Sequence, residues 1–375
     1  MNNPSPEHST FYLVGTTGNP NYGDELIAAT WLKYLAHHAP EATVWLDCPN
    51  PGPSEVLLGE LHPNVRFTDT FWRLCWQASS GEPWQVASFV RQAIDNPGMA
   101  PRWVAGIRVA ARADVFHIIG GGYINGIWPH HIGLLAAAVA SSEHSGGRLA
   151  MTGQGLTPVA ADARPLVREL ARHFDVVDVR DEPSSEVLAD VAGVTSTGDD
   201  LFFDTGSGLY RDDQVPEVMV CIQSDLLTLS APALAGHVLD TLRQWGVPSE
   251  QVGFVEGIPR VDREIFALVE HELPGARFYP FSEIMDNGLP ATAGQRWLST
   301  RFHMHLMAAA AGASGTAIVI DTNYYTNKHR SLIERGSGWS LNTDLSMSQP
   351  PTGGFDPGTL RKLHASKVSL ARRIY

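Results

Sequence analysis

The chain alternates short apolar runs with longer segments of helical period, and this alternation limits the possible folds more than any other feature. In the first half, the segments between the runs place apolar side chains on one helical face, as Leu26, Ile27 and Trp31 do. Strands that alternate with helices in this way are typical of βα units around a parallel sheet. We therefore predict a doubly wound α/β domain with strands near residues 11–14, 43–46, 115–119, 148–152 and 176–179.

The stretch after Asp204 interrupts this pattern. Residues 205–216 lack periodicity and are rich in turn-forming residues, which predicts a linker. The alternation then restarts, and a length of 375 residues also favours two domains. The second set of strands is expected near 218–222, 252–255, 276–279 and 317–320, with helices near 232–244, 262–271 and 303–311. We predict two Rossmann-like doubly wound domains, 1–205 and 217–345, joined by a linker 206–216 and followed by a tail 346–375 whose helix returns to the first domain.

Charge and cysteine content narrow the function and the compartment. The 27 Lys and Arg residues against 40 Asp and Glu residues give a net charge of −13, which excludes a basic nucleic-acid binder as the default. The three cysteines, Cys48, Cys75 and Cys221, are widely spaced and form no C-x-x-C pair, as expected in a reducing cytoplasm. Residues 1–10 lack the basic and apolar regions of a signal peptide, and 304–320 are too short and too broken to span a bilayer. We expect a cytoplasmic protein.

The tail carries an amphipathic pattern with two interpretations. Apolar residues from Leu360 to Ile374 follow helical spacing, and five basic residues surround them: Arg361, Lys362, Lys367, Arg372 and Arg373. The helix either contacts an anionic membrane at its inner face or packs on the body of the protein with a solvated basic face. Packing is the commoner outcome for a short amphipathic helix, so we favour it and keep peripheral membrane contact as the alternative.

Glycine-rich loops follow three of the predicted strands. Residues 15–24 precede a helix, where α/β sheets bind ligands, but they match neither the dinucleotide-binding nor the phosphate-binding glycine motif. Asn21, Gly23 and Asp24 therefore either line a ligand cleft, or Asn21 and Asp24 simply cap the helix. Two further strand ends are also rich in glycine, and they contain Gly121, Gly122 and Gln154. These ends favour a shared cleft, although glycines would also be needed for tight turns.

Three strand ends carry cations that suit an anionic ligand. Arg180 follows the strand near 176–179 and precedes Asp181 and Ser184 at a helix start, so it either binds an anion or pairs with a carboxylate on the surface. Arg301 and His303 lie at another strand-to-helix transition, where a histidine suits acid/base chemistry or an oxyanion. Lys328 follows the strand near 317–320.

A metal site is not expected at these positions. His303 and His305 are two residues apart, so a helix would point them to different faces. No Cys, Asp or Glu lies nearby at ligand spacing.

The ordered set of these motifs resembles the polysaccharide pyruvyl transferase family. The resemblance runs from residue 18 to residue 328 and rests on 18–24, 120–122, 153–155, 179–181 with Ser184, 199–200, Ser299 with Arg301 and His303, and Lys328. It implies two Rossmann-like domains arranged as in GT-B glycosyltransferases, with an interdomain cleft. It also implies phosphoenolpyruvate as donor and a sugar of a cell-envelope glycan or glycolipid as acceptor. The products are then a cyclic pyruvate ketal and phosphate.

The resemblance also suggests roles for the site residues. Arg180, His303 and Lys328 match the family's functional Arg, His and Lys by motif context, and we assign Arg301 and Ser184 to the donor side as well. His303 would deliver a proton or contact phosphate, and Asp24 would act as the base. The acceptor side would contain Asn21, Gly23, Gly121, Gly122 and Gln154.

No metal and no cofactor other than phosphoenolpyruvate as co-substrate is implied, and a homo-oligomer is left open. The alternatives are a GT-B glycosyltransferase that uses a nucleotide sugar, an enolpyruvyl transferase, or a non-catalytic protein of envelope assembly.

Overall fold

A computed structural model describes residues 9–225, 229–319, 325–346 and 353–375, and the chain forms two compact units. The first unit contains the chain up to Asn19, then Asp24–Phe203 and Ala365–Tyr375, while the second contains Pro20–Gly23 and Asp204–His364. Each unit is an α/β domain built on one parallel sheet. The domain limits inferred from the sequence stay predictions, because the ends of a compact unit need not coincide with a turn-rich stretch of sequence.

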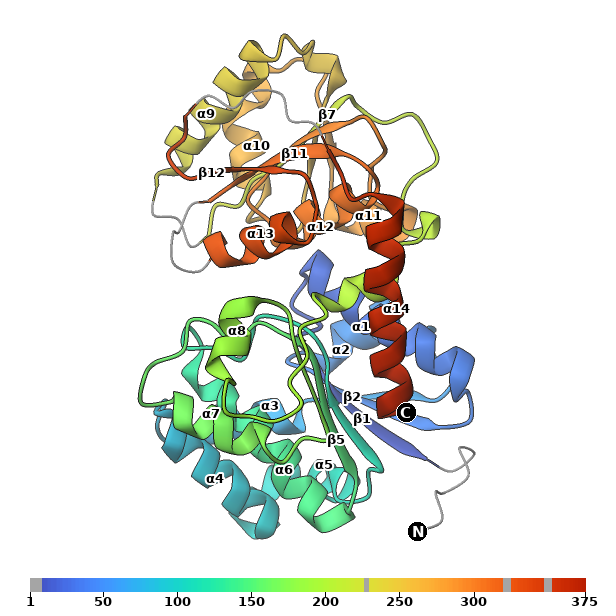
Figure 1. Ribbon diagram of the computed structural model, residues 1–375, viewed down its shortest axis with the longest axis vertical. Helices are drawn as coiled ribbons and strands as arrows, with labels where there is room; N and C mark the ends of the chain where they lie inside the picture. The colour runs from blue at the N-terminus through green and yellow to red at the C-terminus, as the bar shows by residue number, and fades with distance from the viewer. Residues whose placement is uncertain (1–8, 226–228, 320–324, 347–352) are drawn as a thin grey trace. The chain divides into compact units, whose positions relative to one another are not determined.

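The first unit holds a six-stranded sheet in the order β3-β2-β1-β4-β5-β6, with every neighbouring pair parallel. Figure 1 labels β1, β2 and β5 of this sheet. This is the strand order of the doubly wound Rossmann domain. Its central strands are buried on both faces, which explains why they appear in the sequence as continuous apolar runs. The strands are β1 (Thr10–Val14), β2 (Thr43–Asp47), β3 (Val65–Thr68), β4 (Val115–Ile118), β5 (Arg148–Gln154) and β6 (Val176–Val179).

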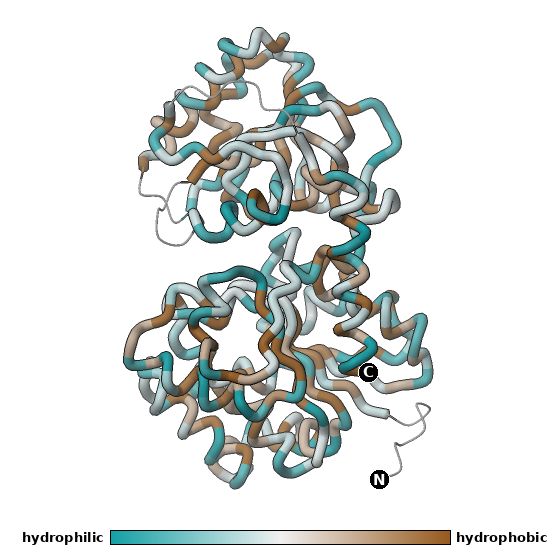
Figure 2. Tube along the Cα trace, viewed as in Figure 1, coloured by the Kyte–Doolittle hydropathy of each residue, from teal (hydrophilic) through white to brown (hydrophobic). Residues whose placement is uncertain are grey.

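Helices cover this sheet and close its core. The most buried of them, α6 (Gly133–Ser145), is rich in alanine, so its backbone can pack closely against α4 (Pro83–Asp95). Figure 2 shows apolar residues concentrated along the strands and polar ones on the outer turns. The remaining helices of this part of the chain are α1 (Tyr22–His38), α2 (Pro51–Leu58), α3 (Thr70–Gln77), α5 (Val104–Ala110), α7 (Arg164–Ala171) and α8 (Glu182–Val187).

The second unit repeats the same winding. Its parallel sheet has the order β12-β11-β10-β7-β8-β9, which is the Rossmann order again when its strands are counted from β7. The strands are β7 (Val218–Cys221), β8 (Val252–Val255), β9 (Arg277–Tyr279), β10 (Arg296–Ser299), β11 (Ser314–Ile318) and β12 (Ser340–Asn342). The helices are α9 (Ala231–Gln244), α10 (Arg263–Val269), α11 (Phe281–Asn287), α12 (Phe302–Ala310) and α13 (Tyr325–Glu334). The prediction of two Rossmann-like domains is confirmed.

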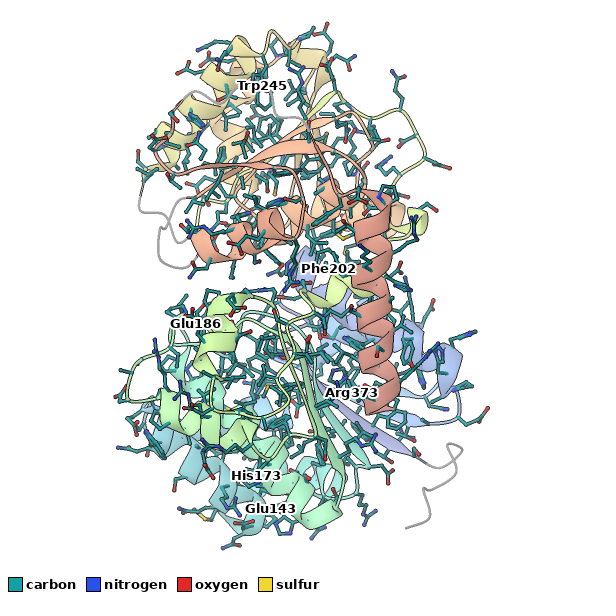
Figure 3. The ribbon with its side chains drawn as sticks, in the orientation of Figure 1. Glu143, His173, Glu186, Phe202, Trp245 and Arg373 are labelled. Carbon is teal, nitrogen blue, oxygen red and sulfur yellow. The ribbon has the colours of Figure 1, made fainter. Side chains whose placement is uncertain are left out.

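The helix of the tail, α14 (Pro357–Ile374), buries the apolar side chains near its C-terminal end. Leu370 and Ile374 are buried, while Arg361, Lys362, Arg372 and Arg373 stay exposed (Figure 3 labels Arg373). A membrane would therefore meet basic side chains but not these two apolar ones, and membrane contact stays a prediction. In the described parts of the chain, no helix is both long and apolar enough to cross a membrane.

One basic residue of that tail lies in the core. Lys367 is fully buried, pairs with Asp178 at 3.0 Å and Asp200 at 2.8 Å, and donates to the carbonyl of Gly198. The sequence pattern placed Lys367 on the solvated basic face, and this was wrong, because the two buried carboxylates that attract it are far away in sequence.

Candidate functional site

The sites predicted from the sequence lie at the carboxyl edges of the two sheets. In each sheet the winding reverses between the first and the fourth strand, β1 and β4 in one and β7 and β10 in the other. Loops leave such a pair in opposite directions, so a crevice opens where doubly wound domains bind their ligands. In the second unit the loops that follow β7 and β10 are joined by a bond from the backbone amide of Gln223 to the hydroxyl of Thr300, 2.9 Å long.

His303 lies at this edge, in the first turn of α12, and is partly exposed. The segment Pro20–Gly23 belongs to the same unit, where the amide of Tyr22 donates to the carbonyl of Gly257 at 2.9 Å. Gly23 then passes so close to His303 that a Cβ on it would lie 1.7 Å from the imidazole Nδ1. Only glycine leaves room for the ring. The structure thus brings together two residues that the sequence had placed in separate groups.

Arg301, two residues before His303, is held by two carboxylates. Its Nη2 donates to Asp262 at 2.6 Å and to Asp225 at 2.9 Å, and its Nε also donates to Asp262. Burial alone would lower the pKa of Arg301, but the two carboxylates outweigh it, so the pKa is raised. One cation against two anions leaves this cluster with a negative formal charge. Arg301 therefore fixes the start of α12 in this structure, and its contact with the donor stays a prediction.

A pair of buried histidines joins α12 to α13. His305 and His329 approach through their Nδ1 atoms at 3.0 Å, while Nε2 of His329 lies 3.1 Å from the carbonyl of Thr300. Since a carbonyl only accepts, His329 donates through Nε2 and its Nδ1 accepts from His305. Burial lowers the pKa of His329 to about 4 and that of His305 well below its usual value. Both rings are therefore neutral groups that hold the two helices together.

Lys328 adjoins this pair in the sequence. It lies in the first turn of α13 and is partly exposed. The predicted strand near 317–320 corresponds to β11, which ends at Ile318, and Ile320 lies outside the described residues. Lys328 thus belongs to a helix start rather than directly to a strand end. A cation here is anchored to α12 through His329, the next residue.

Arg180 is buried in the first unit. Its amide donates to the carbonyl of Gln154 at 3.0 Å, and its guanidinium pairs with Asp199 at 3.6 Å and Asp181 at 3.7 Å with only 2% of its surface exposed. A Cβ on Gly155 would lie 2.2 Å from Nη2 of Arg180, so glycine is needed for the side chain to pass. The alternative of a surface ion pair was therefore wrong about exposure, although Asp181 is one of the partners.

Ser184 and Gln154 form bonds that hold the loops in place. The Ser184 hydroxyl donates to Asp181 at 2.5 Å and accepts from the amide of Leu156 at 2.9 Å. The Gln154 amide donates to the carbonyls of Ile119 at 2.7 Å and Thr152 at 3.1 Å. Both side chains are fully buried, so they fasten neighbouring loops to each other.

The other residues predicted for the acceptor side lie at the ends of β1 and β4. Gly121 is buried with a φ of 154°, whereas Gly122, Asn21 and Asp24 are partly exposed. Sequence reasoning missed the next residue, Glu25, which is buried and accepts from the amide of Gly18 at 2.8 Å. The signal available was a second acidic residue in the first turn of a helix that faces the core.

Among the described residues, no group of three His, Cys, Asp or Glu is placed to hold a metal ion.

A family model described as polysaccharide pyruvyl transferase matches residues 21–230, more than half of the 375 residues. The matched part contains Asp24, Arg180 and Ser184 and ends before His303 and Lys328. No curated protein matches the sequence significantly.

Solved structures with similar folds cover nearly the whole chain. A UDP-N-acetylglucosamine 2-epimerase has a TM-score of 0.56 at 11% identity, over 98% of this chain and 94% of that one. The UDP-GlcNAc 2-epimerase of Methanocaldococcus jannaschii, in complex with UDP-GlcNAc and UDP, has a TM-score of 0.53 at 10% identity, over 97% and 99%. A ugt transferase from Siraitia grosvenorii, in complex with UDP, has a TM-score of 0.50 at 13% identity, over 97% and 94%. These likenesses show the fold, which is that of GT-B enzymes, while the implied interdomain cleft stays a prediction.

Proposed function

Because the chain belongs to the polysaccharide pyruvyl transferase family, we propose that it moves the pyruvyl group of phosphoenolpyruvate onto two hydroxyls of one sugar. The acceptor is a sugar of a cell-envelope glycan or glycolipid, and the products are a cyclic pyruvate ketal and phosphate. The family and the GT-B fold support the transferase class. The identities of the donor, the acceptor and the ketal product are what we propose beyond that class.

The reaction needs one proton delivered and two removed. A proton added to the methylene carbon of phosphoenolpyruvate leaves an oxocarbenium-like centre at the next carbon, where the first sugar hydroxyl attacks and loses its proton. The second hydroxyl then displaces phosphate and loses its own proton. Each turnover therefore forms two C–O bonds and one C–H bond, and it breaks the π bond of the enol, the C–O bond to phosphate and two O–H bonds of the sugar. The protein must supply an acid, a base and positive charge beside the phosphate.

The observation that carries the proposal is the placement of His303 and Lys328 in the second unit. Both lie in the first turns of helices, α12 and α13, that the His305–His329 bond holds together. An imidazole suits proton delivery to the methylene carbon, and an ammonium group suits the phosphate or carboxylate of the donor. Helix N-termini add positive potential in a protein whose net charge is −13. We assign His303 as the acid and Lys328 as a donor contact.

Asp24 is the proposed base. It lies in the first turn of α1, at the switch point of the first sheet, and the residue is partly exposed. A carboxylate at this position can accept the proton of a sugar hydroxyl without a metal ion. In this structure the guanidinium of Arg180 is buried and pairs with two carboxylates. Its contact with the donor therefore stays a prediction.

The test is incubation with phosphoenolpyruvate and a panel of envelope glycosides, following phosphate release. The ketal and an enolpyruvyl ether have the same mass, so the product is identified by proton NMR. A methyl singlet without vinyl signals supports the proposal, and vinyl signals show enolpyruvyl transfer instead. Transfer from nucleotide sugars, with no phosphate released from phosphoenolpyruvate by any acceptor, would make the protein a glycosyltransferase.

A further inference from the structure

The side chain of Glu25 ties the first loop to helix α1. Only 1% of its surface is exposed, and its Oε1 accepts from the amide of Gly18 at 2.8 Å. Its other oxygen, Oε2, is buried and has no hydrogen-bond partner among the described residues. The loop 15–21 is therefore attached at its middle to the helix that follows it.

The opposite side of the loop rests on the start of α2. A Cβ on Gly18 would lie 2.1 Å from the carbonyl oxygen of Asn50, so backbone meets backbone there. The hydroxyl of Ser54 donates to that carbonyl at 3.1 Å and lies 2.8 Å from the hydroxyl of Thr17. Because the single proton of the Ser54 hydroxyl is already used, Thr17 is the donor in the second bond. Cys48 also donates to Ser54. The protons of Thr17, Cys48 and Ser54 are thus donated within this group, and none is donated to Glu25.

The charges around Glu25 do not favour its ionised form. Its neighbour Asp24 is acidic, and no ion pair in the described structure joins Glu25 to a Lys or Arg. Cys48 interacts electrostatically with Glu25. Burial raises the pKa of the Cys48 thiol to about 11, so the thiol carries no charge. Burial is the main reason that the pKa of Glu25 rises to about 8; Asp24 adds to the shift, and the Gly18 amide opposes it.

We propose that Glu25 is a positioning residue that holds the loop 15–21 closed as a neutral acid, and that the loop opens when Glu25 loses its proton. An ionised carboxylate in this place would have one amide donor and a buried oxygen without a partner. Opening the loop lets water reach that oxygen, which is the least costly way to solvate the charge. The loop contains Asn21 and leads into Gly23 and Asp24, so its conformation sets the candidate acceptor side.

The consequence for the reaction rests on the proposed function. A closed loop is expected to hold acceptor residues in place, so turnover falls above pH 8 because the loop opens. The closure itself depends only on the fold and can be measured without substrate. The two ideas therefore fail separately.

The first experiment compares the free energy of unfolding of the wild type, Glu25→Gln and Glu55→Gln from pH 5 to pH 9. The Glu25→Gln side chain copies the neutral acid, whereas Glu55 is an exposed glutamate on α2 and supplies the same change of charge as a control. The pKa of Glu25 is higher in the folded state, at about 8, than its ordinary value of 4.5. The wild type therefore loses stability relative to Glu25→Gln as the pH rises between these values, by up to about tenfold in the folding equilibrium per pH unit, and the difference is constant above 8.

The second experiment follows amide hydrogen exchange of residues 15–21, corrected for the intrinsic effect of pH. Exchange in the wild type should rise above pH 8, while in Glu25→Gln it should stay slow. With substrate, Glu25→Gln should keep wild-type turnover at pH 7 and keep more of it at pH 9.

Three results would overturn the proposal. One is a stability difference that does not change with pH, and another is a loop whose exchange is the same at pH 7 and pH 9. The third is a folded Glu25→Gln variant with a protected loop but no turnover at pH 7, since the proton of Glu25 would then be used in the chemistry. If the variant does not fold, the carboxyl carbon signal of Glu25 in the wild type decides the question, because titration near pH 4.5 contradicts a neutral acid.

Discussion

The backbone of Gly23 lies directly against the imidazole of His303, so close that a Cβ on Gly23 would be 1.7 Å from Nδ1 and 2.0 Å from Cγ. Both residues belong to the second unit, although Gly23 precedes nearly all of the first one in sequence. The candidate acid is thus positioned by a residue 280 places earlier in the chain.

Replacing Gly23 by Ala should displace His303 and lower turnover. Alanine suits a helix better than glycine by about 1 kcal/mol, so a general weakening of α1 is not expected. The added methyl group must push the ring aside, and we expect turnover to fall by about 10²-fold, as for the loss of an acid. Phosphate release and the melting temperature measure the two effects. Gly52→Ala is the matched control, because Gly52 is also the second residue of a helix and has open space around its Cβ position.

Two substitutions of His303 separate its possible roles. Glutamine keeps a hydrogen-bond donor but transfers no proton near neutral pH, whereas alanine removes both capacities. If His303 is the acid, His303→Gln should bind the donor normally and lose turnover by about 10²-fold or more. Donor binding by calorimetry and phosphate release measure this. Wild-type turnover in the Gln variant would remove His303 from the reaction altogether.

Lys328→Ala and Arg180→Ala should differ in their effect on folding. Lys328 is partly exposed, so its loss should leave the melting temperature nearly unchanged. The loss of its charge should reduce the stabilisation of the transition state, measured as kcat/KM for the donor, by about 2–4 kcal/mol. Removing Arg180 leaves the buried carboxylates of Asp181 and Asp199 without their cation, which typically costs about 3–5 kcal/mol. The buried ion pairs of Arg180 therefore predict a lower melting temperature for Arg180→Ala but not for Lys328→Ala.

Urea unfolding of the two variants measures this difference. Arg180→Lys keeps the charge and should recover part of the stability, though not the donor contact. If Arg180→Ala is as stable as the wild type, the ion pairs with Asp181 and Asp199 do not hold the first unit together.

Local sequence patterns predicted the winding of both sheets but not every strand. The strands β3 and β12 lie at sheet edges, where fewer apolar residues are needed, and β10 begins with the charged Arg296. Because their composition is mixed, no apolar run marked them. The central strands β1, β4 and β7 were predicted because both of their faces are buried.

The long-range contacts of the candidate site and of the core could not be predicted in this way. Arg301 pairs with Asp262, 39 residues away, and Lys367 with Asp178, 189 residues away. Such partners are chosen by the folded structure, and no periodicity in the sequence records them. The raised pKa of Glu25 has the same origin, since burial is its main cause.

The stability of the protein should be greatest near pH 6.5. Four histidines are neutral in the folded state because burial lowers their pKa, to about 4 for three of them, whereas the unfolded chain protonates them below 6.5. Two carboxyl groups behave in the opposite way, since burial raises the pKa of Glu25 and Asp47 to about 8. The histidines are His117, His131, His305 and His329.

The sign of each contribution follows from which state binds more protons. Between about pH 4.5 and 6.5 the unfolded chain binds four more protons at these four histidines and two fewer at these two carboxyls, so the six groups together make stability rise with pH by up to about 2.7 kcal/mol per unit. Of these six groups only the two carboxyls differ between 6.5 and 8, and their contribution falls with pH by a similar slope. Urea unfolding at pH 5, 6.5 and 8 measures both slopes. Glu25→Gln should halve the fall above 6.5 and leave a steeper rise below it, and a wild type equally stable at all three values would contradict the burial of these groups in their neutral forms.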